Sequence, residues 1–581
     1  MPHFQTLRYF VLVMLVVFMF VFSGCEQTPP EPEAPPETQA QPEAQASPEV
    51  QVPKAVPKPQ VQLESLMAAA RREYDSAAMG GGMMVIPIAP AQGVAPDTAQ
   101  YGNYADNGVQ QVSQEPLSTF GLDVDTASYA NVRRFLNEGR APHPDAVRAE
   151  EMLNYFPWNS DELVFKPLPE AGSTRADSPF EAAYELAPSP WNPNNVLLSL
   201  SLKAKEVETA EMPPANLVFL VDVSGSMNSS ERLPLVKSSL RMLVDTLRSQ
   251  DRISIVTYSG ATGLALAATP GNEKARILAV IDNLGAGGST AGAAGLALAY
   301  EQAEQSFIKG GINRILLCTD GDFNVGVASA EELTAMVTRQ RDRGITLSAL
   351  GYGTNNFNDA MMVKIADNGN GNYSYIDTLS EAKKVLGAEM SATLLTVAKD
   401  AKAQVEFNPA AVLEYRQIGY EKRLLNAEDF NNDAVDAGDV GAGKQVTVLY
   451  ELTLAGGKPS VDPLRYSQPA EAPEASAGPA NADELAFVKL RWKESGGESS
   501  KLAELPVRKD VLAASFDEAG PHLRFSAAVA AYAQKLRNNP NLAATSWADI
   551  AAWAEAAKGD DPGGYRAEFI KLVGLAGTVM K

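Results

Sequence analysis

The stretch Leu217-Val218-Phe219-Leu220-Val221-Asp222-Val223-Ser224-Gly225-Ser226 joins a continuous apolar run to a short polar loop. An uninterrupted apolar run bounded by such a loop predicts a strand that is buried on both faces. A second apolar run, 315–318, ends at Thr319-Asp320-Gly321. Because ligand-binding loops leave an α/β sheet at the carboxyl ends of its strands, we expect the two polar loops to lie close together.

Strand-like and helix-like runs alternate between residues 214 and 392. Nearly all-apolar strands that alternate with helices predict an α/β fold, with a doubly wound, mainly parallel sheet covered by helices on both faces. The expected strands are 217–222, 253–258, 263–268, 314–319 and 345–350, and the expected helices are 232–248, 273–283, 291–307, 329–341, 358–367 and 380–391.

Hydroxyl and carboxylate side chains are expected to gather at the carboxyl edge of this sheet. Asp222, Ser224 and Ser226 follow the first strand, Asp320 ends a later one, and Thr290 begins a helix after a glycine-rich run. Oxygen ligands suit a hard divalent cation, and Mg²⁺ in particular keeps several waters and binds few protein groups. The sequence therefore predicts a Mg²⁺ site, with Mn²⁺ and Ca²⁺ as alternatives, whose ion can accept one more carboxylate from a partner.

This set of residues resembles the metal-ion-dependent adhesion site of the von Willebrand factor type A (VWA) domain, which has a Rossmann-like fold. The family pattern is Asp-x-Ser-x-Ser, a distant Thr and a distant Asp, and Asp222, Ser224, Ser226, Thr290 and Asp320 match all five positions. The resemblance implies that the three hydroxyls coordinate the ion directly and that the two carboxylates act largely through water. The alternative is a degenerate domain in which the serine loop only caps a helix.

The flanking sequences extend the resemblance to a bacterial family of VWA lipoproteins. Residues 118–156 are similar to the N-terminal module of that family, and the segments 436–443 and 565–569 are similar to its C-terminal module. We therefore expect a small α+β N-terminal module, a VWA domain and a C-terminal module that is β-rich to about residue 505 and helical afterwards. The expected bounds are 116–206, 207–393 and 394–581.

Residues 1–24 have the features of a lipoprotein signal peptide. Arg8 precedes an apolar stretch, 9–22, that is short for a membrane span, and small residues lead to Cys25. We expect Cys25 to be acylated and the polar, Pro-rich residues that follow, 25–115, to form a disordered tether. Because Glu26 rather than Asp follows the cysteine, the resemblance to Gram-negative lipoproteins favours the outer over the inner membrane. The alternative is an uncleaved N-terminal anchor helix.

Charge and motif spacing count against several other functions. The chain has 49 Lys and Arg against 71 Asp and Glu, for a net charge of −22, which disfavours nucleic-acid binding. Residues 438–444 nearly match the P-loop motif, but Gln445 stands where the motif needs a Ser or Thr, so we expect no nucleotide site. The acidic loop 429–439 lacks the glycine and the closing glutamate of an EF-hand, which leaves weak Ca²⁺ binding as an alternative to a solvated loop.

The chain offers few catalytic groups. Beyond the signal segment it keeps only His143 and His522, and neither has a nucleophile beside it in sequence. We therefore expect a non-enzymatic, lipid-anchored cell-envelope protein that binds an Asp or Glu of a partner protein through its metal ion. The alternatives are an envelope assembly or maturation factor that works with a separate AAA+ ATPase, and a hydrolase whose active site is not visible in the sequence.

Overall fold

The computed structural model describes residues 99–122, 125–159, 161–173, 178–289, 292–321, 330–353, 358–435, 437–462, 483–494, 497 and 499–580, all of which belong to one unit, Gly93–Lys581. The predicted signal peptide, Cys25 and residues 26–98 of the predicted tether lie outside the described residues. Thr290 and Asp436 lie outside them as well.

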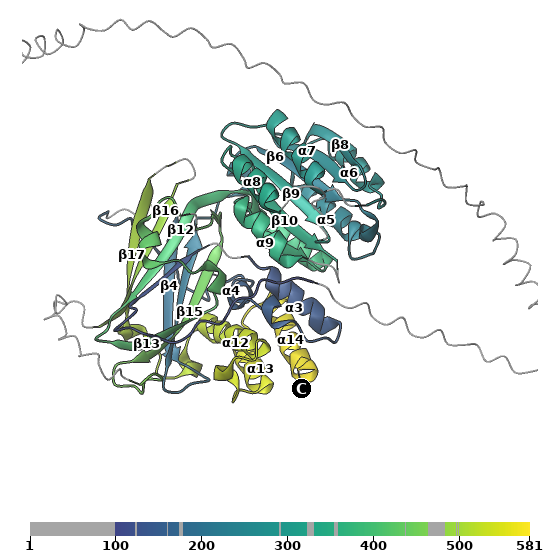
Figure 1. Cartoon of the computed structure of the whole chain (residues 1–581). Helices are drawn as coiled ribbons and strands as arrows, with labels where there is room; N and C mark the ends of the chain where they lie inside the picture. The colour runs from purple at the N-terminus through teal and green to yellow at the C-terminus, as the bar shows by residue number, and fades with distance from the viewer. Residues whose placement is uncertain are drawn as a thin grey trace, which may run out of the picture. The chain divides into compact units, whose positions relative to one another are not determined.

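In the part of the chain that the structure describes, the strands form three sheets (Figure 1). The sheet in residues 215–376, which we call the VWA sheet after the resemblance seen in the sequence, has the order β11-β10-β9-β6-β7-β8, and its strands are parallel except for β8 at one edge. This confirms the predicted doubly wound, mainly parallel α/β fold. The strand bounds are β6 (Ala215–Asp222), β7 (Arg252–Tyr258), β8 (Thr262–Pro270), β9 (Ile312–Thr319), β10 (Thr346–Tyr352) and β11 (Tyr373–Ile376).

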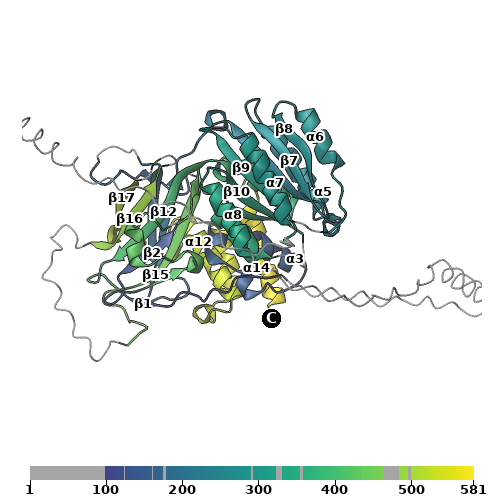
Figure 2. The same ribbon diagram turned by 45° about the horizontal axis from the view of Figure 1, so that its top comes forward.

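Helices cover both faces of the VWA sheet (Figure 2). Leu217, Phe219 and Val221 of β6 pack with α5 and α6, whereas Val218 and Leu220 pack on the opposite face with α7, α8 and α9. This two-sided burial explains why the strand is an unbroken apolar run. The helices are α5 (Leu233–Thr246), α6 (Lys274–Asn283), α7 (Gly292–Gln305), α8 (Ala330–Arg341), α9 (Asp359–Asn368), α10 (Leu379–Lys383), the π-helix η5 (Lys384–Ala388) and α11 (Met390–Leu394).

The other two sheets pack face to face around a shared apolar core that includes Leu200, Val405 and Trp492. One has the order β1-β13-β15-β5-β4-β3, and the other has the order β14-β12-β16-β17 with β2 also paired to β12. Their strands are β1 (Gln110–Gln111), β2 (Leu117–Gly121), β3 (Lys166–Pro167), β4 (Phe180–Pro188), β5 (Val196–Ala204), β12 (Thr396–Phe407), β13 (Val412–Ile418), β14 (Val440–Gly441), β15 (Gln445–Leu454), β16 (Glu484–Lys493) and β17 (Ser500–Arg508).

Strands from before and after the VWA domain are partners in both of these sheets. β5 pairs with β15, and β2 pairs with β12. The sequence predicted an N-terminal module, 116–206, and a C-terminal module, 394–581, and strands of these two segments pair with each other in one β-sandwich. Each segment thus supplies backbone hydrogen-bond partners to the other. The VWA domain is thus inserted between the two halves of the sandwich.

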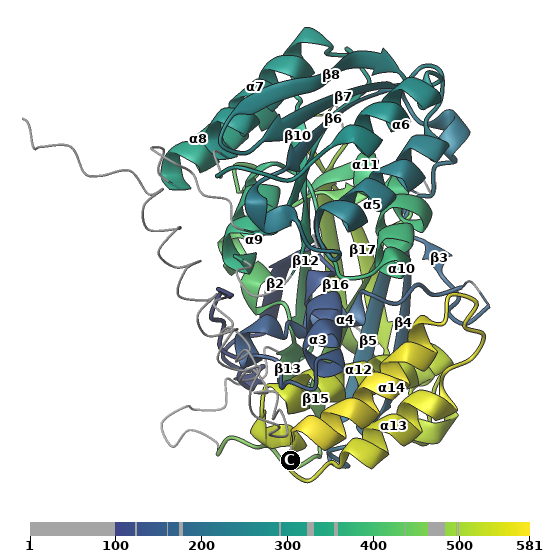
Figure 3. The ribbon, with the colours of Figure 1, turned by 90° about the vertical axis from the view of Figure 1, so that its right-hand side faces the viewer.

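A layer of helices covers the outer face of the β5–β15 sheet, where Leu197 and Leu449 pack against them. α12, α13 and α14 lie side by side near the C-terminus, and α3 lies beside α14 (Figure 3). None of the helices in the described residues has the length and apolar character needed to cross a bilayer. The helices are α3 (Ala127–Asn137), α4 (Ala149–Leu153), α12 (Pro521–Leu536), α13 (Trp547–Ala556) and α14 (Tyr565–Val579), and the short 3₁₀ helices are η2 (Pro144–Ala146), η3 (Thr209–Glu211), η4 (Gly225–Met227), η6 (Glu421–Arg423), η7 (Ala427–Asn431), η9 (Lys509–Val511), η10 (Phe516–Glu518) and η11 (Pro540–Leu542).

Residues 99–115 fall within the predicted tether, yet they make definite contacts. The side-chain amide of Asn107 donates to the backbone carbonyl oxygens of Gln417 (3.2 Å) and Gly419 (2.8 Å). Val112 is buried in the core of the sandwich. Ordered structure is therefore present within the segment that the sequence assigned to the tether.

Buried ion pairs join the VWA domain to the helical layer. Arg133 of α3 contacts Asp377 (2.5 Å) and Glu381 (2.7 Å) of the VWA domain, and Glu568 of α14 (2.8 Å). Arg148 contacts Asp359 of α9 at 2.8 Å. A buried charge is costly unless it is paired, so these contacts fix where the VWA domain sits against the helices.

We expect Arg133→Met to lower the free energy of unfolding by about 3–5 kcal/mol, because it leaves two buried carboxylates without their cation. The control is Arg343→Met, which removes an exposed pair with Glu304 and should change stability by about 0–1 kcal/mol. Urea unfolding followed by tryptophan fluorescence measures both variants. Equal losses in the two variants would contradict a special role for Arg133.

Candidate metal centre

The serine loop is folded by hydrogen bonds to Asp222, the last residue of β6. The backbone N–H of Ser224 donates to Asp222 Oδ1 at 2.8 Å, and the hydroxyl oxygens of Ser224 and Ser226 are 2.9 Å apart. Two hydroxyls and a carboxylate are thus brought together within one short turn. This is the local part of the predicted ligand set.

The glycine-rich loop that precedes Thr290 is bonded to the serine loop. The N–H of Gly225 donates to the carbonyl of Gly288 (3.0 Å), and the N–H of Gly287 donates to the carbonyl of Val223 (2.7 Å). Gly288 has φ +87°, and a Cβ there would be 3.1 Å from the backbone nitrogen of Gly260, so a side chain is disfavoured. The structure therefore places residues 287–289 at the site, while the position of Thr290 itself stays a prediction.

Asp320 follows β9, the strand next to β6, and so lies at the same edge of the sheet. The preceding residue ties the two loops together, because the hydroxyl of Thr319 donates to Asp222 Oδ2 at 3.3 Å. Asp320 Oδ2 accepts a hydrogen bond from Arg232 Nη1 at 2.8 Å, and the same nitrogen donates to the carbonyl of Ser226 at 2.7 Å. Four of the five predicted residues, Asp222, Ser224, Ser226 and Asp320, are thus brought together.

The two carboxylates of this site are buried, so their negative charge is costly unless a cation balances it. The exposed fractions of Asp222 and Asp320 are 0% and 1%. Burial, with the nearby charge of Asp320 adding to it, raises the pKa of Asp222 to about 6 despite the hydrogen bond from Ser224. Two neighbouring buried carboxylates are stabilised by a cation, and the adjacent hydroxyl oxygens are ligands of the kind that a hard divalent ion takes. The residues present therefore fit such an ion.

Within the described residues, no group of three or more His, Cys, Asp or Glu side chains is arranged to hold a metal. The predicted ligand set contains two such side chains, Asp222 and Asp320, so metal binding there relies on the hydroxyl groups as well and stays a prediction. Zinc sites in proteins are built mainly from Cys and His, and the predicted ligand set contains neither.

Arg232, which precedes α5, is a member of the site that sequence reasoning missed. Its guanidinium supplies the positive charge next to Asp320. Gly353 makes room for it: this residue has φ +83°, and a Cβ there would be 2.3 Å from Arg232 Nε. The sequence held no signal for this contact, because it joins residues 232, 320 and 353 from three separate loops.

The structure also places the other residues considered from sequence. Cys318 is buried within β9, and burial raises the pKa of its thiol to about 12, which fits an inert core residue. A strand, β15, follows Lys444, so the near-P-loop has no helix to bind phosphate. In the acidic loop, Asp433 is engaged by Arg491 (3.2 Å) and Ser500 (2.7 Å).

His522 forms a buried cluster that the sequence did not reveal. Its Nδ1 lies 2.8 Å from a carboxylate oxygen of Glu185, and its Nε2 lies 3.3 Å from the hydroxyls of both Ser201 and Thr447. A carboxylate, an imidazole and a hydroxyl in this order form the arrangement used to activate a serine. Ser201 and His522 are only 2% and 0% exposed, however, and the ring of Trp158 packs edge-on against the imidazole at 4.6 Å. The cluster therefore acts as a structural hydrogen-bond centre.

The comparisons with known proteins agree with this fold. A model of the von Willebrand factor type A domain matches residues 216–388, a second von Willebrand factor model matches 95–199, and the C-terminal model of the uncharacterized protein YfbK matches 392–579. YfbK of Escherichia coli (strain K12) is 57% identical over 485 residues, which are 83% of this chain and 82% of YfbK. The chain belongs to the YfbK family of VWA proteins.

Two further similarities are more distant. An uncharacterized protein of Synechocystis sp., sll0103, is 30% identical over 185 residues, which are 32% of this chain and 43% of that protein. A solved structure described as von Willebrand factor type A from Catenulispora acidiphila covers 71% of this chain and 91% of its own, at 15% identity and a TM-score of 0.38. Membership of the VWA family indicates a role in protein–protein interaction, and proteins with this domain are typically not enzymes.

We expect His522→Ala to lower the free energy of unfolding by about 2–3 kcal/mol, because it leaves Glu185, Ser201 and Thr447 without their shared partner. Ser201→Ala should cost about 1 kcal/mol, since it removes one end of the cluster. Both are measured by urea unfolding. A fluorophosphonate probe should leave Ser201 unlabelled, and its labelling in the folded protein would show that the cluster is catalytic.

Proposed function

We propose that this protein binds a protein partner through a divalent cation, Mg²⁺ foremost, with Mn²⁺ and Ca²⁺ as alternatives. The observation that carries the proposal is the meeting of two buried carboxylates and two serine hydroxyls at the carboxyl edge of the VWA sheet. When bound, the ion offers an electrophilic position to an Asp or Glu of the partner. The residues that would hold it are Asp222, Ser224, Ser226, Thr290 and Asp320.

The roles of these residues follow from their charge. Ser224 and Ser226, together with Thr290, are neutral ligands, so they leave most of the ion's charge for an incoming carboxylate. Asp222 and Asp320 balance part of that charge, largely through water in this proposal. Their burial keeps the local charge interactions strong, because water screens them little.

The guanidinium of Arg232 balances the negative charge of Asp320, as a metal ion would. This group binds the carboxylate and the carbonyl of Ser226, and both oxygens border the site. An ion bound near Asp320 therefore competes with Arg232 for the negative charge of that carboxylate. In the proposed function, Arg232 sets how tightly the metal binds.

We also propose that Cys25 is lipidated and that the domain stands on a tether in the cell envelope, at the outer membrane of a Gram-negative bacterium. The support is the apolar stretch ending at Cys25 and the Pro-rich sequence after it. A role in envelope assembly or maturation with a separate AAA+ ATPase is the second candidate. Finding the chain in the cytoplasm without an acyl group on Cys25 would favour that candidate.

We expect Asp222→Ala to abolish Mg²⁺ binding without unfolding the protein, because it removes a carboxylate from a site where two are buried together. Calorimetry with Mg²⁺ and a crosslinking pull-down in Mg²⁺ or EDTA measure the effect. Loss of a buried charged contact with a partner commonly costs about 2–5 kcal/mol. The matched control is Asp282→Ala, an exposed carboxylate on α6. A partner set that is unchanged in EDTA would contradict the proposal.

We expect Arg232→Gln to tighten Mg²⁺ binding roughly tenfold, equivalent to about 1.4 kcal/mol, because the ion no longer competes with a guanidinium for Asp320. The measurement is the Mg²⁺ dissociation constant at fixed pH and ionic strength. Arg276→Gln, at an exposed position on α6, is the control for loss of one positive charge. Weaker binding in Arg232→Gln would instead show that this side chain supports the metal-bound state.

A further inference from the structure

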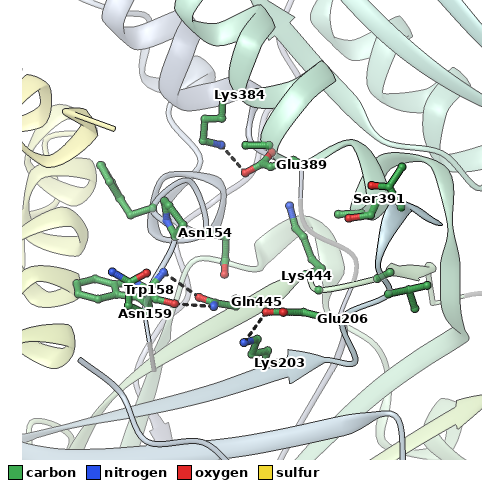
Figure 4. Close-up of a pocket in the computed structure, with 18 of the residues that line it drawn as sticks. Asn154, Trp158, Asn159, Lys203, Glu206, Lys384, Glu389, Ser391, Lys444 and Gln445 are labelled. Atoms are coloured by element: carbon green, nitrogen blue, oxygen red, sulfur yellow. Dashed lines mark hydrogen bonds and ion pairs between the residues drawn. The ribbon is translucent and has the colours of Figure 1, made fainter. Parts of the chain in front are cut away.

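A cavity of about 650 Å³ lies where the VWA domain, the β-sandwich and the helical layer meet (Figure 4). Its walls come from all three family-matched segments: Asn154, Trp158 and Asn159 from the first, Lys384 and Ala388 from the VWA domain, and Lys444, Gln445 and Tyr565 from the third. Its volume lies in the range of small-molecule sites, about 300–1,000 Å³. None of the four described metal-site residues lines it, so it is a separate site.

The walls of the cavity are held in place by hydrogen bonds. The side-chain amide of Gln445 donates to the carbonyl of Trp158 (2.8 Å) and accepts from its N–H (3.0 Å). Asn154 accepts from the N–H of Thr447 at 2.6 Å, and the guanidinium of Arg566 stacks on the ring of Trp158 at 4.0 Å. A ligand would therefore meet a preformed surface and would lose little free energy in ordering it.

Two of the three lysines that line the cavity are paired. Lys203 contacts Glu206 at 2.7 Å, and Lys384 contacts Glu389 at 2.7 Å. Lys384 also lies 4.1 Å from the centre of the Tyr155 ring. These contacts leave the charges of both lysines largely satisfied by the protein.

Lys444 is different. Among the described residues, its ammonium group makes no ion pair or hydrogen bond, although its backbone is fixed by bonds to Gly441 (3.1 Å) and Ala204 (2.9 Å). Its side chain extends toward Glu389 across the open space of the cavity (Figure 4). Its charge acts together with that of Lys384 on Glu389, since, despite burial, both ammonium groups lower the pKa of that carboxyl. Two ammonium groups thus face one carboxylate, which leaves one surplus positive charge for a ligand in the cavity.

The other groups on the walls narrow the chemical class of that ligand. No arginine lines the cavity, and three carboxylates, Glu206, Glu208 and Glu389, border it, so a phosphate dianion would meet repulsion without the bidentate donors that favour it. One ammonium group suits a single carboxylate. Asn159 and Ser391 carry an amide and a hydroxyl, which are groups that hydrogen-bond to peptide units.

We propose that the cavity binds a short peptide through its free carboxylate, with Lys444 as the counter-ion and Asn159 and Ser391 as partners of the peptide groups. The site takes its specificity for a terminal carboxylate from the surplus positive charge that Lys384 and Lys444 leave after balancing Glu389.

The test uses the full chain and two probes, acetyl-Ala-Ala-Ala with a free carboxylate and the same peptide with a carboxyl-terminal amide. Saturation-transfer NMR and calorimetry should show binding of the acid and at least tenfold weaker binding of the amide. Lys444→Gln should weaken binding of the acid at least tenfold, whereas Lys444→Arg should keep most of it. Lys364→Gln, an exposed lysine on α9, should have no effect.

Three results would overturn the proposal: no saturable binding of the acid, equal binding of acid and amide, or binding that Lys444→Gln leaves unchanged. Displacement of the peptide by inorganic phosphate at a lower concentration than the peptide itself needs would show that the ligand class is wrong. If Lys444→Gln were unstable, the comparison of acid with amide on the unaltered chain would still decide. Because Asp222→Ala leaves this cavity intact, failure here is distinct from failure of the metal site.

Discussion

The guanidinium of Arg133 holds the parts of this protein together. It lies on α3 and contacts two carboxylates of the VWA domain and one of α14, so three segments far apart in sequence meet at one charge. Two of its partners, Asp377 and Glu381, stand just before the π-helix η5, which lines the cavity through Lys384. Since buried charges tolerate little displacement from their partners, this contact also fixes the walls of the cavity.

Two buried aspartates differ in how the protein balances their negative charge, and this difference distinguishes a structural contact from the proposed metal site. Burial raises the pKa of Asp125, but Lys422, Arg423 and the N–H of Tyr373 outweigh it, so its pKa is lowered. At Asp222 burial prevails, and the neighbouring Asp320 adds to it, so the pKa is raised to about 6. The first carboxylate has its cations within the protein. The second lacks that compensation, which is the state expected of a group that takes a cation from solution.

Local patterns in the sequence were enough to predict the VWA sheet and the meeting of Asp222, Ser224, Ser226 and Asp320. A strand buried on both faces, such as β6, must be apolar throughout, and loops at the carboxyl ends of parallel strands share one edge. The remaining features depend on contacts between residues far apart in the sequence, which no local pattern indicates. Arg232 and Asp320 are 88 positions apart in the sequence, and Ser201 and His522 are 321 positions apart. For the same reason, the pairing of β5 with β15 could not be read from either segment alone.

The two proposed sites are joined by continuous packing within the VWA domain. The π-helix η5, whose Lys384 lines the cavity, packs against α5 through Val385 and Leu386, and α5 begins directly after Arg232. The cavity, through Lys384 of η5, and the metal site, through Arg232 beside α5, therefore both border one packed layer. Coupling between the two sites would be reciprocal: if the peptide changes the affinity for the metal by some factor, thermodynamic linkage requires the metal to change the affinity for the peptide by the same factor.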